Sequence, residues 1–310
     1  MTINNVSIEP GEQKVVKVHI GRLPSDTRIH INIHIFRSQV PGPTMLVLAG
    51  VHGDEINGVE IVRRTIASRF FDKLQCGSVI VIPLLNVYGF INFSREVPDG
   101  KDVNRSFPGN LNGSLASRVA RSITKKVLPF VDFGIDFHTG GRNNYNYPQV
   151  RYTAGDPASA ELAQAFDAPF TLANRPIARS LRKVALKKEI PIIVYEGGEN
   201  ARLDGFSIEQ GLMGLRRLMV AKGMLEGTLS PERSQHFSQA TWLRAGKSGL
   251  FRWQKNSGHG IRKGEPLGVI NDPYGMDEIP VIAPRSGYII GHNNAPVVNT
   301  GDALFHIVHS

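Results

Sequence analysis

One short stretch near residue 50 constrains the fold more than any other part of the chain. An apolar run from Met45 to Ala49 breaks at a glycine and is followed by His52 and Glu55. Apolar residues then recur at the spacing of one helix face, namely at Ile56, Val59, Val62, Ile66 and Phe70. The stretch therefore predicts a buried strand that ends at His52 and a helix that runs to about residue 71. In α/β folds, ligands bind at the carboxyl ends of such strands.

Strands and helices alternate along the rest of the first 228 residues. The apolar patterns predict further strands over residues 13–20, 28–36, 78–84, 131–138 and 190–195. They predict further helices over residues 114–127, 156–166, 179–188 and 207–222. The segment 86–109 is rich in Gly, Pro, Asn and Asp, so we expect a long functional loop there. This alternation predicts an α/β domain with a parallel or mixed sheet flanked by helices.

The pattern changes after about Thr228. Helical periodicity disappears, and short strand-like runs alternate with Gly and Pro turns, as in residues 249–253, 267–270, 286–290 and 303–308. Such spacing is typical of a small all-β sandwich or barrel. We therefore expect two domains, an α/β domain over residues 1–228 and a C-terminal β-domain over residues 229–310.

Composition narrows the classes of protein that the chain can represent. Cys76 is the only cysteine, which excludes an internal disulfide and a thiolate metal cluster. No apolar run is long enough to span a bilayer, and the first residues lack the pattern of a signal peptide, so we expect a cytoplasmic protein without a membrane partner. The formal net charge is +9, which suits an anionic substrate or a solvated basic surface equally. The basic cluster lacks the interleaved aromatic residues of single-strand nucleic-acid binders, so we expect no nucleic-acid partner; it comprises Arg179, Arg182, Lys183, Lys187 and Lys188.

Histidine and glutamate residues stand at the ends of three predicted strands. His52 and Glu55 follow the first, His138 ends the second just before two glycines, and Glu196 ends the third. Two histidines and one glutamate form a catalytic zinc site that keeps a position open for water. The remaining glutamate can then act as general base. Each residue also has an ordinary structural alternative, a hydrogen-bonded histidine or a helix-start carboxylate, but four such coincidences at successive strand ends favour one site.

Nearby residues can complete such a site. Asp136 lies two residues before His138 on a strand, so it can fix the orientation of that imidazole by a hydrogen bond to the second ring nitrogen. The segment 86–109 supplies Arg95, Asn104 and Arg105. An arginine can bind a carboxylate by two parallel hydrogen bonds, and a second arginine can stabilise a developing oxyanion. Alternatively, these arginines pair with acidic side chains on the surface, and such ion pairs contribute little to stability.

These motifs together resemble the succinylglutamate desuccinylase/aspartoacylase family, which belongs with the zinc carboxypeptidases. The resemblance rests on His52-Gly-Asp-Glu55, Asp102-Val-Asn104-Arg105, Asp136-Phe-His138 and Tyr195-Glu196. It implies a zinc-carboxypeptidase-like mixed sheet with a small C-terminal β-domain. It also implies that zinc binds to His52, Glu55 and His138, that Glu196 is the base, that Asn104 and Arg105 bind a substrate carboxylate, and that Arg95 polarises the carbonyl.

The C-terminal segment resembles a biotinyl/lipoyl-type barrel sandwich, through Ile282-Ala-Pro-Arg-Ser-Gly287 and Val298-Asn-Thr-Gly-Asp302. A carrier of that type presents a modifiable lysine on a hairpin tip. The expected tip, residues 271–278, contains no lysine. We therefore expect this domain to be a cap or an oligomerisation element, which leaves a homo-oligomer open.

Three functions remain in competition at this point. The first is a zinc-dependent deacylase that hydrolyses the amide bond of a small, carboxylate-bearing N-acyl amino acid or related N-acylated amine. The second is a metallocarboxypeptidase that acts on peptides, since the same site serves both reactions. The third is a non-catalytic binding or carrier protein built on this fold. The acyl group and the amine are not specified by the sequence.

Overall fold

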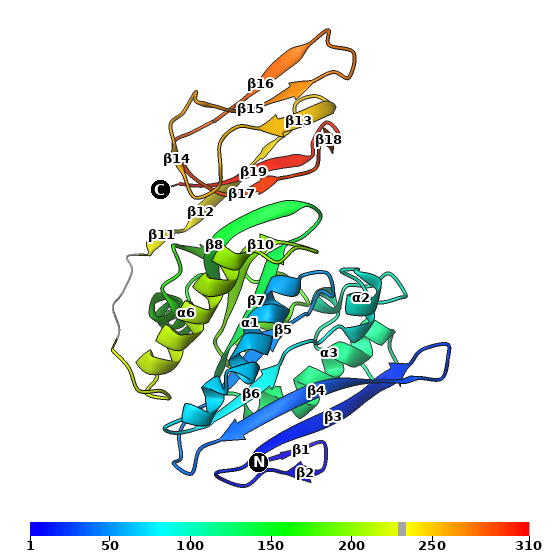
Figure 1. The fold of residues 1–310 in the computed structure, drawn as a ribbon, viewed down its shortest axis with the longest axis vertical. Helices are drawn as coiled ribbons and strands as arrows, with labels where there is room; N and C mark the ends of the chain where they lie inside the picture. The colour runs from blue at the N-terminus through cyan, green and yellow to red at the C-terminus, as the bar shows by residue number, and fades with distance from the viewer. Residues whose placement is uncertain (229–233, 310) are drawn as a thin grey trace.

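The computed structural model describes residues 1–228 and 234–309. Its largest feature is a 13-stranded mixed sheet, with helices on both faces and a second, smaller sheet at the C-terminal end (Figure 1). The domain boundary expected between residues 228 and 229 falls at residues 229–233, outside the described residues, so it stays a prediction. No helix in the described ranges combines the length and the apolar character needed to cross a membrane.

Four parallel strands form the centre of the large sheet. They lie in the order β10 (Ile192–Glu199), β7 (Phe133–Gly140), β5 (Thr44–Ala49) and β6 (Ser78–Ile82). One edge is extended by the antiparallel strands β4 (Arg28–Arg37) and β3 (Gln13–Arg22). On the other side, β8 (Asn144–Thr153) runs antiparallel to β10. The predicted α/β class with a mixed sheet is confirmed.

Burial on both faces explains why the central strands are apolar throughout. In β5, Leu46 and Leu48 enter one hydrophobic cluster, whereas Met45 and Val47 enter the other. The first cluster includes residues of α3 (Leu115–Lys126) and α5 (Leu181–Leu186). The second includes residues of α1 (Ile56–Ala67), α4 (Pro157–Phe166) and α6 (Gly205–Ala221). A parallel sheet covered by helices on both faces requires such continuous apolar runs.

The C-terminal region joins the large sheet directly, and its strands pair antiparallel except for the short strand β11 (Gln235–Phe237), which pairs in parallel with β9 (Phe170–Asn174). Strands β17 (Gly287–Asn293), β19 (Ala303–His309) and β12 (Gln239–Arg244) follow β8 in the sheet order. The second sheet contains β16 (Glu278–Ile282), β15 (Pro266–Asn271), β13 (Gly249–Trp253) and β18 (Val297–Val298). The short strands are β1 (Thr2–Ile3), β2 (Val6–Ser7), β9 (Phe170–Asn174), β11 (Gln235–Phe237) and β14 (Gly260–Ile261). The all-β character expected after Thr228 is confirmed for the described residues.

The structure also differs from the sequence expectations in four places. Strand β5 ends at Ala49, so His52 lies in the following turn. Strands β7 and β10 continue to Gly140 and Glu199, so His138 and Glu196 lie within strands and do not end them. The expected loop 86–109 contains a helix of six residues, α2 (Val87–Asn92), whose first turn is capped by the side chain of Asn86. A helix this short shows no clear apolar period. Strands β8 and β9 were not predicted, because the β8 sequence lacks a regular apolar alternation.

Candidate metal centre and catalytic pocket

The turn after β5 places His52 by close packing against α2. Gly53 lies against the backbone of this helix, and a Cβ atom at Gly53 would lie 2.0 Å from the carbonyl carbon of Gly89. Only glycine fits there, so the His-Gly-Asp-Glu order is tied to the path of the segment 86–109. As a result, the His52 side chain is directed into the protein and is only 3% exposed.

Glu55 occupies the N-cap position of α1 but does not cap the helix with its side chain. N-cap positions favour Ser, Thr, Asp or Asn, whose short side chains bind the first free N–H groups. The longer Glu55 side chain instead extends toward the two histidines, and the backbone N–H of Thr139 donates to its Oε2 at 3.2 Å. The start of α1 therefore fixes the backbone position of Glu55, and the contacts with the two histidines and Thr139 orient its side chain.

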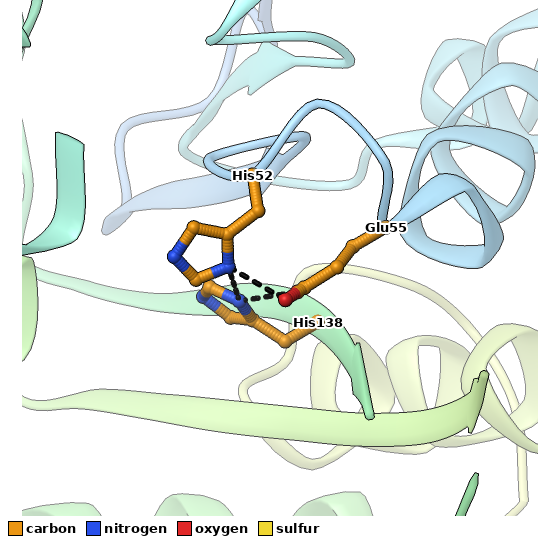
Figure 2. Close-up of side chains that lie close together, drawn as sticks. All are labelled: His52, Glu55 and His138. Atoms are coloured by element: carbon orange, nitrogen blue, oxygen red, sulfur yellow. Dashed lines mark hydrogen bonds and ion pairs between the residues drawn. The ribbon is translucent and has the colours of Figure 1, made fainter. Parts of the chain in front are cut away.

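Three potential metal ligands converge where these segments meet (Figure 2). Glu55 Oε1 lies 2.7 Å from His52 Nδ1, and Glu55 Oε2 lies 2.8 Å from His138 Nδ1. The two Nδ1 atoms are 3.2 Å apart, and one ligand atom from each residue lies within 4.8 Å of the others. The residues come from the turn after β5, the start of α1 and strand β7, so the structure brings together all three sequence-predicted ligands.

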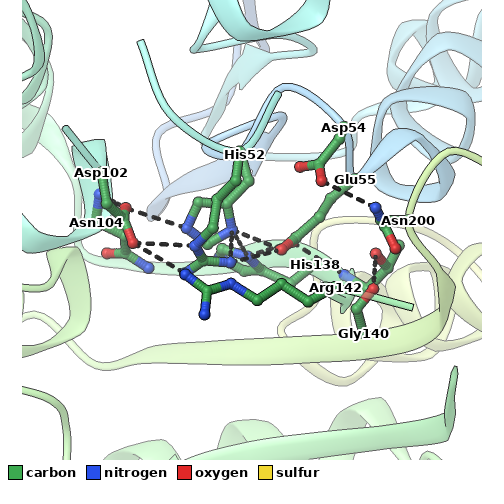
Figure 3. A network of polar contacts seen from close by, with 12 residues as sticks. His52, Asp54, Glu55, Asp102, Asn104, His138, Gly140, Arg142 and Asn200 are labelled. Atoms are coloured by element: carbon green, nitrogen blue, oxygen red, sulfur yellow. Dashed lines mark hydrogen bonds and ion pairs between the residues drawn. The ribbon is translucent and has the colours of Figure 1, made fainter. Parts of the chain in front are cut away.

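The second nitrogen of each histidine contacts another carboxylate. His138 Nε2 lies 2.9 Å from Asp136 Oδ2, as the sequence predicted for this pair. His52 Nε2 lies 3.2 Å from Asp102 Oδ1 (Figure 3). Such outer carboxylates fix the tautomer of a metal-binding histidine so that its free nitrogen points to the metal. Asp102 belongs to the Asp102-Val-Asn104-Arg105 motif, but no role was predicted for it; its position two residues before Asn104 was the available signal.

The charges of this cluster oppose the effect of burial. Burial lowers the pKa of His138, but the carboxylates of Asp136 and Glu55 outweigh it and hold that pKa well above the usual value. Burial also lowers the pKa of His52, but Glu55 and Asp102 outweigh it and raise that pKa above the usual value. Burial would raise the pKa of Glu55, but the two imidazoles hold it well below its usual range. The Glu55 carboxylate and the two histidines beside it are thus suited to binding a cation between them.

Arg95 also reaches this cluster from the segment 86–109. Its Nη2 donates to Asp102 Oδ2 at 2.9 Å, and its Nη1 lies 3.1 Å from Glu55 Oε1. Burial lowers the pKa of the guanidinium, but the charges of Glu55 and Asp102 raise it above its usual value. Arg95 is therefore a cation held beside the three potential ligands, next to Glu55.

One cavity of about 240 Å³ joins the remaining predicted site residues to this cluster. Its lining includes Glu196, Asn104 and Arg105. Glu196 is paired in register with His138 on the neighbouring parallel strand, which explains why the two residues lie side by side. Asn104 Oδ1 accepts a hydrogen bond from the backbone N–H of Leu181, and Arg105 is the more exposed of the two. All the residues proposed from the sequence thus lie in or around one pocket.

The cavity also contains residues that the sequence analysis did not place there. They include Asn146, Arg151, Asn174, Arg182 and Trp242. Arg182 belongs to the basic cluster described from the sequence, and it is only 8% exposed. Burial and the charge of Arg151 lower its pKa to about 10, and its Nη1 has no hydrogen-bond partner among the described residues. A buried, incompletely bonded cation in a pocket is suited to an anionic ligand.

Comparison with known proteins identifies the family. The model of the succinylglutamate desuccinylase/aspartoacylase catalytic domain matches residues 41–221. The chain belongs to this family. The resemblance stated from the motifs is confirmed, and the matched span contains every residue that the sequence analysis placed in the site. As a member of this family of deacylating hydrolases, the protein is an enzyme, as predicted.

Individual relatives cover nearly the whole chain. The N-alpha-acetyl-L-2,4-diaminobutyric acid deacetylase of Halomonas elongata is 27% identical over 280 residues, which is 85% of this chain and 81% of that protein. The structure of a succinylglutamate desuccinylase/aspartoacylase from Rhodobacter sphaeroides has a TM-score of 0.86 at 25% identity and covers 96% of this chain and 95% of its own. The product-bound ectoine utilization protein EutE (DoeB) from Ruegeria pomeroyi has a TM-score of 0.89 at 21% identity, with coverage of 100% and 98%. The last likeness shows the shared fold, including the C-terminal domain.

Proposed function

We propose that this protein is a zinc-dependent deacylase that hydrolyses the amide bond of a small N-acyl amino acid. The observation that carries the proposal is the convergence of His52, Glu55 and His138, with Glu196 in the same cavity. The family match supports the deacylase class, and the donor set supports the metal. The enzyme would act in the cytoplasm on a small molecule, without a nucleic-acid partner, and homo-oligomerisation stays a prediction.

The residues present fit a zinc ion. Two imidazole nitrogens and one carboxylate are the ligand set of many catalytic zinc sites, and both imidazoles are oriented by outer carboxylates. When bound, zinc lowers the pKa of water and polarises a carbonyl group. His52 and His138 would hold the ion in their neutral forms and Glu55 as a carboxylate, because metal ligands must be deprotonated.

The protein's own residues would carry the remaining steps. Glu196 accepts a proton from the attacking water as the new C–O bond forms. It then delivers this proton to the amide nitrogen as the C–N bond breaks, so the products are a carboxylate and a free amine. The Arg95 guanidinium donates hydrogen bonds to the carbonyl oxygen as negative charge develops there. Asp102 holds Arg95 in place for that role through two contacts with one carboxylate oxygen.

Asn104, Arg105 and Arg182 favour a substrate that carries a carboxylate. Arg182 lines the cavity and has an Nη1 atom without a hydrogen-bond partner among the described residues, and Arg105 of the segment 86–109 lines the same cavity. The name of the Halomonas elongata relative specifies deacetylation of an N-acetylated amino acid. We therefore propose an N-acyl α-amino acid whose carboxylate binds to these cations. The carboxypeptidase alternative has no support from the relatives, and the lysine-free hairpin tip does not favour a carrier.

A substrate panel tests the proposal. Zinc-loaded protein is incubated with N-acetyl and N-succinyl amino acids, including N-acetyl-L-2,4-diaminobutyrate, and amine release is followed. We expect release from at least one N-acyl amino acid, loss of activity after chelation and recovery with zinc. Peptides longer than dipeptides serve as the comparison. Release of C-terminal residues from these peptides, without deacylation of the panel, would replace the deacylase proposal by the carboxypeptidase alternative.

A further inference from the structure

Strand β8 carries an irregularity beside Glu196. In its pairing with β10, Glu196 lies opposite Gln149, and Gly198 lies opposite Asn146. Two steps on β10 therefore match three steps on β8, so β8 contains one extra residue, as in a β-bulge. Pro148, which has no N–H for the ladder, lies in this interval. Bulges near active sites re-aim side chains.

The bulge allows two β8 side chains that are five positions apart in the sequence to contact the Glu196 carboxylate. Asn146 Nδ2 donates to Glu196 Oε2 at 2.9 Å. Arg151 Nη1 lies 3.2 Å from Glu196 Oε1. In a regular strand, residues five apart point to opposite faces. Each Glu196 oxygen thus has one partner on β8, and each keeps a further lone pair for a proton.

The C-terminal region contacts β8 at the same residue. Strand β17 pairs with it so that Gly291 lies opposite Asn146. A Cβ atom at Gly291 would lie 2.8 Å from Asn146 Oδ1 and 2.9 Å from the backbone oxygen of Tyr145. The missing side chain at Gly291 therefore leaves the space that the Asn146 amide occupies. Asn146 is 5% exposed, so it has little room to move elsewhere.

We propose that Asn146 is a positioning residue for the Glu196 carboxylate, and that Gly291 of the C-terminal region keeps Asn146 in place. The C-terminal region then takes part in catalysis through strand pairing, in addition to lining the cavity with Trp242. This inference rests on the proposed role of Glu196 as the proton-transferring group. It assigns Asn146 no contact with the reacting atoms; its effect passes through the orientation of Glu196.

Two substitutions at Asn146 test whether this residue positions Glu196. Asn146→Ala removes the donor, and Asn146→Asp keeps the volume but places a carboxylate against Glu196. We expect kcat to fall about 10- to 100-fold in both variants, with KM changed by less than about threefold, zinc content unchanged, and a larger loss for Asn146→Asp. If both variants keep kcat within about twofold of wild type while Glu196→Gln is inactive, the inference is wrong and the proposed function stands. If Glu196→Gln keeps wild-type turnover, the proposed role of Glu196 itself fails.

A double-mutant cycle tests whether Gly291 keeps Asn146 in place. Gly291→Ala alone should lower kcat about fivefold to tenfold, because the new methyl group displaces the Asn146 amide. In the Asn146→Ala background it should lower kcat by less than about twofold, because the amide that the methyl group displaces is absent. The contact with the backbone oxygen of Tyr145 is present in both backgrounds, so it cancels in the coupling free energy of the cycle. Gly260→Ala is the matched control, because its Cβ would lie 3.5 Å from the nearest atom of Tyr288. Equal effects of Gly291→Ala in both backgrounds would overturn the proposed link.

Discussion

Two pairs of buried histidines in this protein have opposite acid–base character. His52 and His138 at the candidate metal centre are 3% and 4% exposed, and His292 and His306 in the C-terminal region are both 6% exposed. Carboxylates raise the pKa values of the first pair. Burial lowers the pKa of His292 to about 4 and, together with the charge of Arg151, that of His306 to about 3. Equal burial therefore does not define a functional histidine.

The surroundings of the two pairs account for the difference. His306 stacks on Trp242 with ring centroids 4.2 Å apart and planes 2° apart. His292 lies between Tyr145 and Trp253, with centroids 5.2 Å and 4.6 Å away, and its Nδ1 contacts Ser257 Oγ at 2.7 Å. Aromatic rings and a hydroxyl group favour the neutral imidazole of a packed histidine. Neighbouring carboxylates favour its protonated form or the binding of a metal cation.

The largest expected effect comes from removing the carboxylate between the two histidines of the candidate metal centre. Glu55→Gln makes the surroundings of His52 and His138 more like those of the C-terminal pair. We expect zinc binding to be lost and deacylation to fall by about three orders of magnitude, because several kcal/mol of metal-dependent stabilisation disappear. Zinc content and initial rates are measured on the same preparation. Full zinc content in this variant would show that Glu55 is not a ligand.

A smaller effect is expected from the outer carboxylate of His138. Asp136→Asn keeps the shape of the side chain but weakens its hold on His138 Nε2. We expect zinc affinity to fall about 10- to 100-fold, as for other outer partners of metal-binding histidines. Competition with a chelator of known affinity measures the change. Asp26→Asn, at an exposed position, is the matched control, and an equal loss in the control would remove Asp136 from the account.

The smallest effect concerns acid stability in the C-terminal region. The folded-state pKa values of His292 and His306 are below the unfolded value of about 6.5, so the unfolded chain binds more protons between about pH 4 and 6.5. Stability should therefore fall as the pH drops from 7 to 5, by about 1–2 kcal/mol for each histidine. His306→Gln should remove its share of this loss. Denaturant unfolding at both pH values measures it.

The matched control for that experiment is His259→Gln, because His259 is exposed. This control should retain the wild-type loss of stability between pH 7 and 5. If His306→Gln loses as much stability on acidification as wild type, His306 is not the buried neutral group that the structure places beside Trp242.

The sequence supported the prediction of the fold and of the residues at the candidate metal centre because these follow from local patterns. The run Met45–Ala49 is apolar since both faces of β5 are buried, and His138 and Glu196 follow apolar runs on neighbouring parallel strands. The other pocket residues depend on long-range pairing. Asn146 and Arg151 meet at Glu196 only because β8 is bulged, and Trp242 reaches the cavity only because β12 joins the large sheet beyond β19. No local spacing encodes these contacts.

Measurement of zinc content and turnover in Glu196→Gln tests the central claim most directly. The account predicts a single zinc ion per chain, as in wild type, because Glu196 is not one of the three ligands. It also predicts that turnover on the preferred N-acyl amino acid falls by about 10²- to 10⁴-fold, since the general base is missing. Wild-type turnover in this zinc-loaded variant would contradict the account.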